Sequence, residues 1–440
     1  MFDVFGTRVD EIIWPAGYTT MLKRGYQAGI VWRAFDEDSL SSALLLGYIT
    51  SFYDPGMYCP FTVSLSSALP LSKYAPPEVL KTYLPHLLRK DEGVWQGATW
   101  MTEAGGGSDL GAQVNTIACR HGQFWQLTGE KYFASNAGAE LAVAAARPEN
   151  APPGVRGLAL FLVPRLRIDG SLNYTIRRLK DKIGTRSVPT AEVEFNSSEA
   201  YLLGQPEIGV YLVLEVLNIS RVANSIGAVA LTQRALRDAL LFAEDRPAFG
   251  KMLLEQPLLL EQFRDRTSML HGAFALAWEA VQLLDQVWQE TPGNYSARFH
   301  LFRLVVHLAK YWTAENAMQT AKWAMEVHGG MGVLAEYQVE RWLREAMILS
   351  IWEGPAHRQI LDALEVMEQK KAHLLLIEHL SPHIAQDQAD DMIKLFESHF
   401  AMPADRREAL AEPLIRTLAA FASQALLRKL SSGNRSAPSL

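Results

Sequence analysis

The stretch that decides the fold covers residues 326–354 and reads EVHGGMGVLAEYQVERWLREAMILSIWEG. It places a glycine-rich turn and a carboxylate, Glu353, among segments with a helical pattern. Three glycines within four positions, Gly329, Gly330 and Gly332, end a helix and let another group approach the backbone closely. Without further context, they predict a helix C-terminus followed by a turn.

The carboxylate of Glu353 follows an apolar run that includes Ile351 and Trp352. Because apolar surroundings disfavour the charged form, we expect the pKa of Glu353 to lie above its ordinary value. A raised pKa suits a general base that works near neutral pH. The alternative is a carboxylate stabilised by the dipole of the helix that begins near Pro355. The residues alone leave both interpretations open.

The composition is that of an ordinary soluble protein. With 440 residues, 49% of them hydrophobic, the chain can bury a large core, and its length predicts two to three domains. A net charge of −6 argues against a dedicated nucleic-acid-binding protein, which normally carries a basic patch. Cys59 and Cys119 are too few for a disulfide framework or a zinc site, so we expect a reducing compartment and two buried cysteines.

The chain shows no signal-peptide pattern and no run of about 18 uncharged apolar residues. We therefore expect neither secretion nor a membrane span, and a cytoplasmic location. No metal site is expected.

Hydrophobic periodicity divides the chain into four parts. They are an N-terminal helical domain (1–95), a middle β domain (96–205), a C-terminal four-helix bundle (206–367), and additional helices with a tail (368–440). Strands are predicted at 123–127, 158–163 and 192–195. Apolar residues repeat at helical spacing from Leu231 to Phe242 and from Leu301 to Trp312, which predicts core-facing stripes.

Prolines mark the expected helix breaks. Amphipathic helices are predicted at 18–32 and 40–53. The expected breaks are Pro60, Pro70, Pro76, Pro77, Pro382, Pro403 and Pro413. The polar tail at 431–440 is expected to be disordered.

Two motifs resemble signatures of the acyl-CoA dehydrogenase family. Glu336, Arg341 and Glu345 follow Glu326 and the glycines at the offsets of its C-terminal signature. The loop at 101–109, MTEAGGGSD, resembles the family's Thr-Glu-x2-Gly-Gly-Ser-Asp signature, although the preceding tryptophan replaces a usually small residue. The resemblance implies an α+β fold with an N-terminal helical domain, a middle β domain and a C-terminal helical bundle. It also implies an FAD-dependent oxidoreductase.

The resemblance assigns the loop at 101–109 to FAD, although a glycine-rich loop alone is more often only a turn. Backbone N–H groups and hydroxyls of such a loop can converge on a planar, polar ligand. Phe133 would stack on the flavin and Ser135 would bond near N5, the alternative being an ordinary strand with a half-buried phenylalanine. The FAD contacts expected in this part are Met101, Thr102, Gly107, Ser108, Phe133 and Ser135.

The bundle carries further FAD contacts by the same resemblance. The arginine and phenylalanine of the stretch RPAFGK at 246–251 would reach the FAD of a neighbouring subunit, where the planar guanidinium suits a diphosphate. An arginine at a helix end otherwise complements the dipole. The residues expected to contact FAD are Arg246, Phe249, Gln256, Glu326, Gly329, Gly330, Trp352, Pro355 and His357. These contacts imply a homo-oligomer, typically a tetramer built as a dimer of dimers.

The resemblance makes Glu353 the catalytic base, since Ser220 occupies the position where some members carry that carboxylate. Glu353 would remove the proton α to a thioester carbonyl while a hydride leaves the β carbon for flavin N5. The substrate contacts implied are Ser108, Asn218, Arg221 and Gly354. The implied partners are an acyl-CoA or acyl-carrier thioester, and an electron-transfer flavoprotein or oxygen as acceptor.

Stretches at 3–10, 178–195 and 351–354 resemble the AidB-like branch, whose members are associated with DNA through a basic C-terminal region. Residues 362–440 hold nine Lys and Arg against eleven Asp and Glu, and Glu365 stands where that branch has an arginine. We therefore favour an enzyme and expect no nucleic-acid partner. The alternatives are an AidB-like flavoprotein of the DNA alkylation response, a nitroalkane-oxidase-like enzyme, which uses Asp as base, and a flavoprotein without turnover.

Overall fold

The computed structural model describes residues 2–37 and 39–433. They form two compact units, one comprising the chain up to Thr50 and Gly56–Ser220, the other Ser51–Pro55 and the chain from Arg221 onward. Each unit is described by itself. The predicted domain boundaries stay a prediction.

The N-terminal segment of the chain is helical, as predicted. Its helices are α1 (Ala16–Ala28), α2 (Arg33–Asp36), α3 (Ser41–Tyr53), α4 (Pro55–Tyr74) and α5 (Pro77–Leu87). The predicted breaks at Pro60 and Pro70 are wrong, because both prolines lie inside α4. An interior proline costs about 3 kcal/mol, which burial of the α4 side chains Phe61 and Leu65 offsets. The breaks at Pro76 and Pro77 are confirmed, since these residues begin α5.

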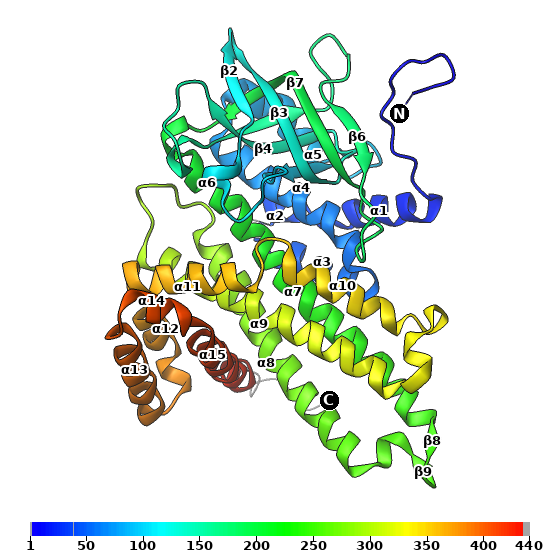
Figure 1. Ribbon diagram of the computed structural model, residues 1–440, viewed down its shortest axis with the longest axis vertical. Coiled ribbons are helices and arrows are strands. Elements are labelled where there is room, and N and C mark those ends of the chain that lie inside the picture. Colours follow the sequence, from blue (N-terminus) through cyan, green and yellow to red (C-terminus); the bar gives the residue numbers. More distant parts are fainter. Residues whose placement is uncertain (1, 38, 434–440) are drawn as a thin grey trace. The chain divides into compact units, whose positions relative to one another are not determined.

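The middle of the chain folds into a β domain (Figure 1). Its strands are β1 (Gly97–Trp100), β2 (Ile117–His121), β3 (Phe124–Ser135), β4 (Leu141–Pro148), β5 (Ala159–Pro164), β6 (Thr175–Leu179) and β7 (Thr190–Leu203). Strands β4, β2, β3, β7 and β5 pair in that order, and β5 pairs back with β4, so the sheet closes on itself. The three predicted strands are confirmed as parts of β3, β5 and β7.

The interior of this closed sheet is lined by small residues and a few large rings. Ala142, Ala144 and Ala146 of β4 are fully buried beside Phe161 and Trp100. The Trp100 indole packs edge-on against the ring of Tyr174 and donates a hydrogen bond to the Ser135 carbonyl oxygen at 2.9 Å. The expectation that both cysteines are buried is wrong for Cys119, which lies on an exposed face of β2.

The second unit is a helical bundle with a helical extension. Its long helices are α7 (Gly209–Asp245, which begins in the first unit), α8 (Pro257–Val287), α9 (Ala297–Val327), α10 (Val339–Ile351) and α11 (Ala356–Lys370). The extension comprises α12 (Ala372–Leu380), α13 (Gln386–Phe400), α14 (Ala404–Ala409) and α15 (Ala411–Gly433). The predicted core stripes are confirmed, with Leu231 and Val305 fully buried, but they end in half-buried Phe242 and Trp312.

Two predictions for the C-terminal extension need adjustment. Pro382 and Pro403 do mark helix ends, but Pro413 lies in the first turn of α15, where a missing N–H is tolerated. The predicted disordered tail is wrong at 431–433, which continue α15, and 434–440 lie outside the described residues.

In the described part of the chain, Pro206–Asp245 is long and apolar enough to span a membrane, yet 83% of its most apolar window is buried within protein, as in a core helix.

Candidate active site

The candidate base lies in a strained turn between α10 and α11. Glu353 has φ 58° and Gly354 has φ 96°, so two consecutive residues occupy the left-handed region. A residue with a side chain rarely adopts this conformation, and such strain is concentrated at active sites. A Cβ on Gly354 would lie 2.7 Å from Nε2 of Gln359, so this position requires glycine.

Three buried side chains from three helices hold the turn by its carbonyl groups. Nε of Arg221, on α7, donates to the carbonyl oxygen of Glu353 at 3.0 Å. Nε2 of Gln359, on α11, lies 2.9 Å from that oxygen and 3.0 Å from the carbonyl oxygen of Gly354. Nζ of Lys310, on α9, donates to the Gly354 carbonyl oxygen at 2.7 Å. The conformation of Glu353 is therefore fixed by contacts distant in sequence.

The electrostatics of the turn suit a base at neutral pH. Burial raises the pKa of Glu353 to about 7, although the charges of Arg221 and Lys310 oppose that rise. Burial and the charge of Arg221 lower the pKa of Lys310 to about 7, while Glu353 and Glu315 oppose that fall. The predicted direction of the Glu353 shift is confirmed. Its cause, burial, is also the predicted one, but Ile351, which was expected to supply part of the apolar surroundings, is 61% exposed.

A second layer of polar groups fixes the side chains that hold the turn. Oδ2 of Asp362 lies 3.3 Å from Nη2 of Arg221, and burial of Asp362 is outweighed by its cationic neighbours, so its pKa is lowered. Nδ1 of His307 lies 2.9 Å from Oε1 of Gln359. Burial lowers the pKa of His307 to about 3, so the ring is neutral. Arg221 thus has a carboxylate partner and Gln359 a neutral one.

The ring next to the candidate base is also oriented. Nε1 of Trp352 donates to Oδ1 of Asn224 at 2.5 Å, and Nδ2 of Asn224 donates to the Leu349 carbonyl oxygen at 3.2 Å. Asn224 itself is buried. Sequence reasoning missed Asn224, Gln359 and Lys310. The only signal in the sequence was that each is a polar residue on an apolar helical stripe.

The glycine-rich loop lies in the β domain and is anchored by a buried ion pair. Oε1 of Glu103 lies 2.7 Å from Nζ of Lys131, and both side chains are almost completely buried. Glu103 also accepts bonds from the backbone N–H groups of Asn115 and Thr116 and from the Thr116 hydroxyl. Burial would raise the pKa of Glu103, but Lys131 and these hydrogen bonds hold it below its ordinary value.

The same loop lies next to the strand predicted to face the flavin. The backbone N–H of Tyr132, on β3, donates to the Thr102 carbonyl oxygen at 3.0 Å. Phe133 is 53% exposed, and the Ser135 hydroxyl lies 3.1 Å from that of Thr190. A Cβ on Gly107 would lie 2.5 Å from Oγ1 of Thr102, so the loop packs too tightly for a side chain there. An exposed ring beside a tight glycine loop fits a planar, polar ligand such as FAD.

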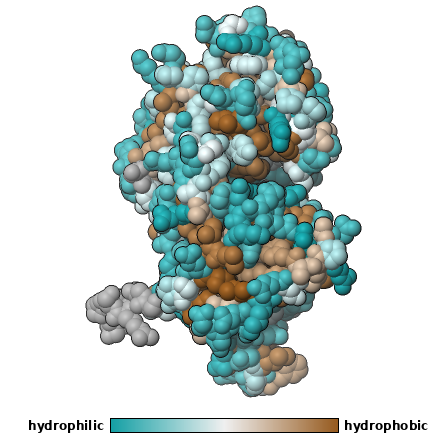
Figure 2. All heavy atoms as spheres, turned by 90° about the vertical axis from the view of Figure 1, so that its left-hand side faces the viewer, coloured by the Kyte–Doolittle hydropathy of each residue, from teal (hydrophilic) through white to brown (hydrophobic). Residues whose placement is uncertain are grey.

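Four of the other predicted FAD contacts lie at exposed places in the second unit, namely Arg246, Phe249, Gly329 and Gly330, whereas Gln256, Trp352 and Pro355 are half-buried. Phe249, at the turn between β8 (Pro247–Ala248) and β9 (Lys251–Met252), is 97% exposed with φ 52°, and Arg246 is exposed beside it. Added Cβ atoms on Gly329 and Gly330 would meet nothing within 4 Å, so this backbone is open to another group. Figure 2 shows hydrophobic side chains gathered into patches on one face of the molecule. Such patches are typical of interaction surfaces.

The other predicted residues are distributed over both units. Asn218 and Arg221 lie one turn apart on α7 and both are buried. Pro355 is the residue before α11, and His357 is exposed in its first turn. Glu326 pairs with Lys322 at 2.5 Å near the end of α9. The predicted roles of these residues in binding FAD or substrate stay predictions.

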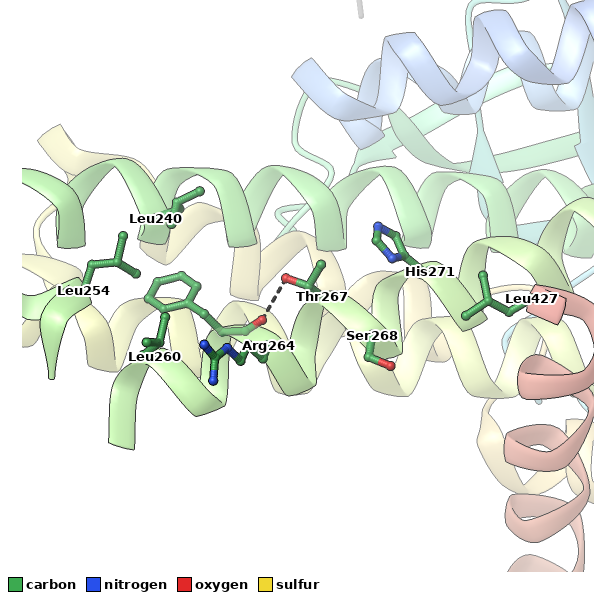
Figure 3. Close-up of a pocket in the computed structure, with 9 residues that line it drawn as sticks. Leu240, Leu254, Leu260, Arg264, Thr267, Ser268, His271 and Leu427 are labelled. Carbon is green, nitrogen blue, oxygen red and sulfur yellow. Dashed lines mark hydrogen bonds between the residues drawn. The ribbon is translucent and has the colours of Figure 1, made fainter. Parts of the chain in front are cut away.

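An apolar groove of about 480 Å³ in the second unit contains none of the predicted site residues. It runs along α8, and residues of α7, α15 and the segment before α8 line its sides (Figure 3). Leu240, Leu254 and Leu260 lie at one end of it and Leu427 at the other, and the Thr267 hydroxyl donates to the carbonyl oxygen of Phe263 at 2.7 Å. The groove is mostly aliphatic and separate from the Glu353 turn.

Family models match three consecutive segments of the chain. The acyl-CoA dehydrogenase C-terminal domain matches residues 207–367, the middle domain of the same family matches 98–198, and the N-terminal domain of the adaptive response protein AidB matches 1–91. The chain belongs to the acyl-CoA dehydrogenase family. This confirms the predicted family, its AidB-like branch, and the predicted α+β fold class.

Individual proteins similar to this chain agree with the family assignment. The putative acyl-CoA dehydrogenase AidB of Escherichia coli K12 is 28% identical over 421 residues, which is 92% of this chain and 75% of AidB. A solved structure of Bd2924 in its apo form has a TM-score of 0.88 at 29% identity, covering 98% of this chain and 87% of that one. Caenorhabditis elegans ACDH-11, solved with C11-CoA, has a TM-score of 0.88 at 24% identity, covering 98% and 78%, and shows the fold alone.

These matches also confirm two predictions at the level of the family. The chain is an oxidoreductase of a family that acts on CH–CH donors, and the cofactor of that family is FAD. The electron acceptor and the oligomeric state are proposals.

Proposed function

We propose that this chain catalyses the α,β-dehydrogenation of an acyl thioester, with Glu353 as the base. The observation that carries the proposal is the Glu353 turn itself. A carboxylate with a pKa of about 7 sits in a strained backbone held by buried Arg221, Lys310 and Gln359. A base with such a pKa is half deprotonated at neutral pH and still basic enough to accept a proton.

The residues of this chain would divide the work as follows. Glu353 takes the proton α to the thioester carbonyl, and its charge is neutralised as it does so. FAD, when bound, accepts the hydride that leaves the β carbon. The glycine loop with Met101, Thr102 and Ser108 and the strand residues Phe133 and Ser135 would bind FAD.

The remaining FAD contacts would come from a second copy of the chain. Exposure of Arg246 and Phe249 supports this role, because a guanidinium and an aromatic ring that face away from their own subunit are free to contact another one. We therefore propose a homo-oligomer, built as a dimer of dimers, in the cytoplasm. Gln256, Glu326, Gly329, Gly330, Trp352, Pro355 and His357 complete the proposed cofactor contacts.

The proposed substrate is an acyl-CoA, or the same acyl group on a carrier protein. The complex of C. elegans ACDH-11 with C11-CoA supports an acyl-CoA. Ser108, Asn218, Arg221 and Gly354 are the proposed substrate contacts. We propose an electron-transfer flavoprotein as the acceptor of the electrons.

Anaerobic reduction of the flavin tests the proposal. Purified protein would be mixed with a panel of acyl-CoAs, and loss of the flavin absorbance would be followed in wild type, Glu353→Gln and Glu365→Gln. Glu365 is an exposed glutamate on α11 and provides the matched control. Reduction that only Glu353→Gln abolishes supports the proposal. A bound flavin that no thioester reduces, with salt-dependent binding of DNA, would instead support the AidB-like DNA alkylation response role.

A further inference from the structure

Lys310 is a buried charge for which sequence reasoning gave no role. It lies in the middle of α9 with 1% of its surface exposed. Its ammonium donates to two carbonyl oxygens, those of Ser350 at 3.1 Å and Gly354 at 2.7 Å. Burial of a lysine is costly and therefore uncommon unless its charge is compensated. What Lys310 contacts is consequently informative about its role.

The two carbonyls lie on either side of Glu353. Ser350 is in the last turn of α10, where the carbonyl groups lack partners within the helix and carry the negative end of the helix dipole. Gly354 is the second residue of the left-handed turn. One ammonium therefore ties the end of α10 and the turn to α9, with Glu353 between them.

We propose that Lys310 is the positioning residue of the base: it fastens the Gly354 and Ser350 carbonyls to α9 and so holds Glu353 in its left-handed conformation. The proposal rests on the proposed function, because it names the base whose position is held. Lys310 acts through Glu353 and is not itself assigned a contact with substrate.

The other two side chains that hold the turn differ from Lys310. Arg221 is compensated by Asp362, and Gln359 is neutral. Both bind the Glu353 carbonyl, and Gln359 also reaches the Gly354 carbonyl, whereas Lys310 is the one of the three that binds the carbonyls of both Ser350 and Gly354. Loss of Lys310 would release the Ser350 carbonyl and leave the Gly354 carbonyl to the neutral Gln359 alone.

The charge of Lys310 also acts on the carboxylate of Glu353. The ionisable groups that act on Glu353 and Lys310 are Arg221 of α7 and Glu315 of α9. Around Arg221 in turn lie Arg303 and His307 of α9 and Arg358 and Asp362 of α11. His307 is neutral at neutral pH, and Arg358 and Asp362 pair with each other. The charges of Lys310 and Arg221 both lower the pKa of Glu353. Removing the Lys310 charge should therefore raise the pH at which Glu353 becomes an active base.

The test uses the flavin-loaded protein with the variants Lys310→Met and Lys310→Gln, and Lys394→Met as control. Lys394 is an exposed lysine on α13, so its loss removes a charge without a buried contact. The rate of anaerobic flavin reduction would be measured from pH 5.5 to 9.5 at saturating acyl-CoA, a range of about 1.5 units below and about 2.5 units above pH 7. Affinity for the thioester would be measured from the change in the flavin spectrum of an unreactive thioether analogue.

Lys310→Met should slow flavin reduction about 10- to 100-fold, the scale expected for a displaced catalytic group. Its affinity for the thioether analogue should stay within about twofold of wild type. The pH at which the rate of reduction rises, called the pH limb below, should shift upward. Lys310→Gln keeps an N–H donor without the charge, so it should recover part of the rate while its pH limb stays shifted. In a further variant, Lys310→Ala, small alkylammonium ions should restore part of the rate of flavin reduction, because they can replace the missing ammonium group. Lys394→Met should behave as wild type.

A rate and pH limb equal to wild type in Lys310→Met would overturn the positioning role. If Lys310→Met does not retain flavin, Lys310→Gln and the alkylammonium experiment test the positioning role instead. A pH limb in Lys310→Gln that is not shifted from wild type would equally overturn that role. Failure of the proposed function gives a different result, because the acyl-CoA would then still reduce the flavin bound to Glu353→Gln. In that case Glu353 is not the base, whatever Lys310 does.

Discussion

Two buried lysines, one in each unit, hold the two functional loops in different ways. Lys131 of the β domain has no exposed surface and pairs with Glu103 at 2.7 Å, which anchors the glycine loop. Lys310 of the bundle is equally buried, but the contacts of its ammonium among the described residues are two carbonyl oxygens. The first lysine is compensated by a full opposite charge, and the second by partial charges.

The difference shows which of the two sites responds to pH. Because its pKa is lowered, Glu103 keeps its charge throughout the neutral range, while burial lowers the pKa of its partner Lys131 and the charge of Glu103 opposes that fall. Lys310 and Glu353 both have a pKa of about 7, so a change in either charge is felt by the other near neutral pH. We propose that Lys131 fixes the loop predicted to bind FAD and that Lys310 holds and tunes the proposed base.

The largest expected effect comes from breaking the compensated pair. Lys131→Met leaves the Glu103 carboxylate buried and unpaired, which should lower the free energy of unfolding by about 3–5 kcal/mol and release the bound flavin. Thermal denaturation and flavin content measure both effects. The double variant Lys131→Met/Glu103→Gln should recover much of the stability, because no charge is left unpaired; an equally unstable double variant would contradict the ion-pair explanation.

A smaller effect is expected at the turn. Gly354→Ala places a Cβ at φ 96°, 2.7 Å from Nε2 of Gln359, and should cost about 2–3 kcal/mol with slower flavin reduction. Gly293→Ala is the matched control, since Gly293 has φ 93° but nothing within 4 Å of its added Cβ. Its cost should be about 1 kcal/mol, from backbone strain alone. Equal losses of stability and rate at both positions would show that the contact with Gln359 does not matter.

The smallest effect is a gain of stability. Because the pKa of Glu353 is raised in the folded state, its contribution to stability is fully present below its unfolded pKa of about 4.3 and is lost as pH rises through about 7. Glu353→Gln removes the group that must ionise, so it should stabilise the protein by about 1–2 kcal/mol at pH 8.5 and change little at pH 4.5. Melting temperatures at the two pH values measure this, and a gain that is the same at both would speak against a raised pKa.

Much of the fold could be predicted from the sequence. The pattern of helical and strand regions along the chain predicted the order of the domains, and the family resemblance predicted their three-dimensional arrangement. The breaks at Pro60 and Pro70 were wrong because local rules for proline do not include the burial of the helix that contains it. The prediction that Cys119 is buried was wrong because residue type does not tell which face of a strand is exposed.

The site could be predicted only in part. The pKa shift of Glu353 was predicted in the right direction, and its role as the base stays a prediction, but the groups that surround it come from α7, α9 and α11. A side chain such as Lys310 is normally interpreted as one that extends its charge to solvent. Only the tertiary structure shows that its ammonium reaches carbonyls 40 and 44 residues away in sequence.

The measurement that tests the central claim most directly is the pH dependence of anaerobic flavin reduction by a saturating acyl-CoA. If Glu353 is the base, the rate should rise with pH as its carboxyl loses a proton, with a midpoint near 7, and Glu353→Gln should remove the reaction while flavin stays bound. A rate that does not change between pH 5.5 and 9.5, a range of about 1.5 units below and about 2.5 units above that midpoint, or reduction of the flavin in Glu353→Gln at the wild-type rate, would contradict it.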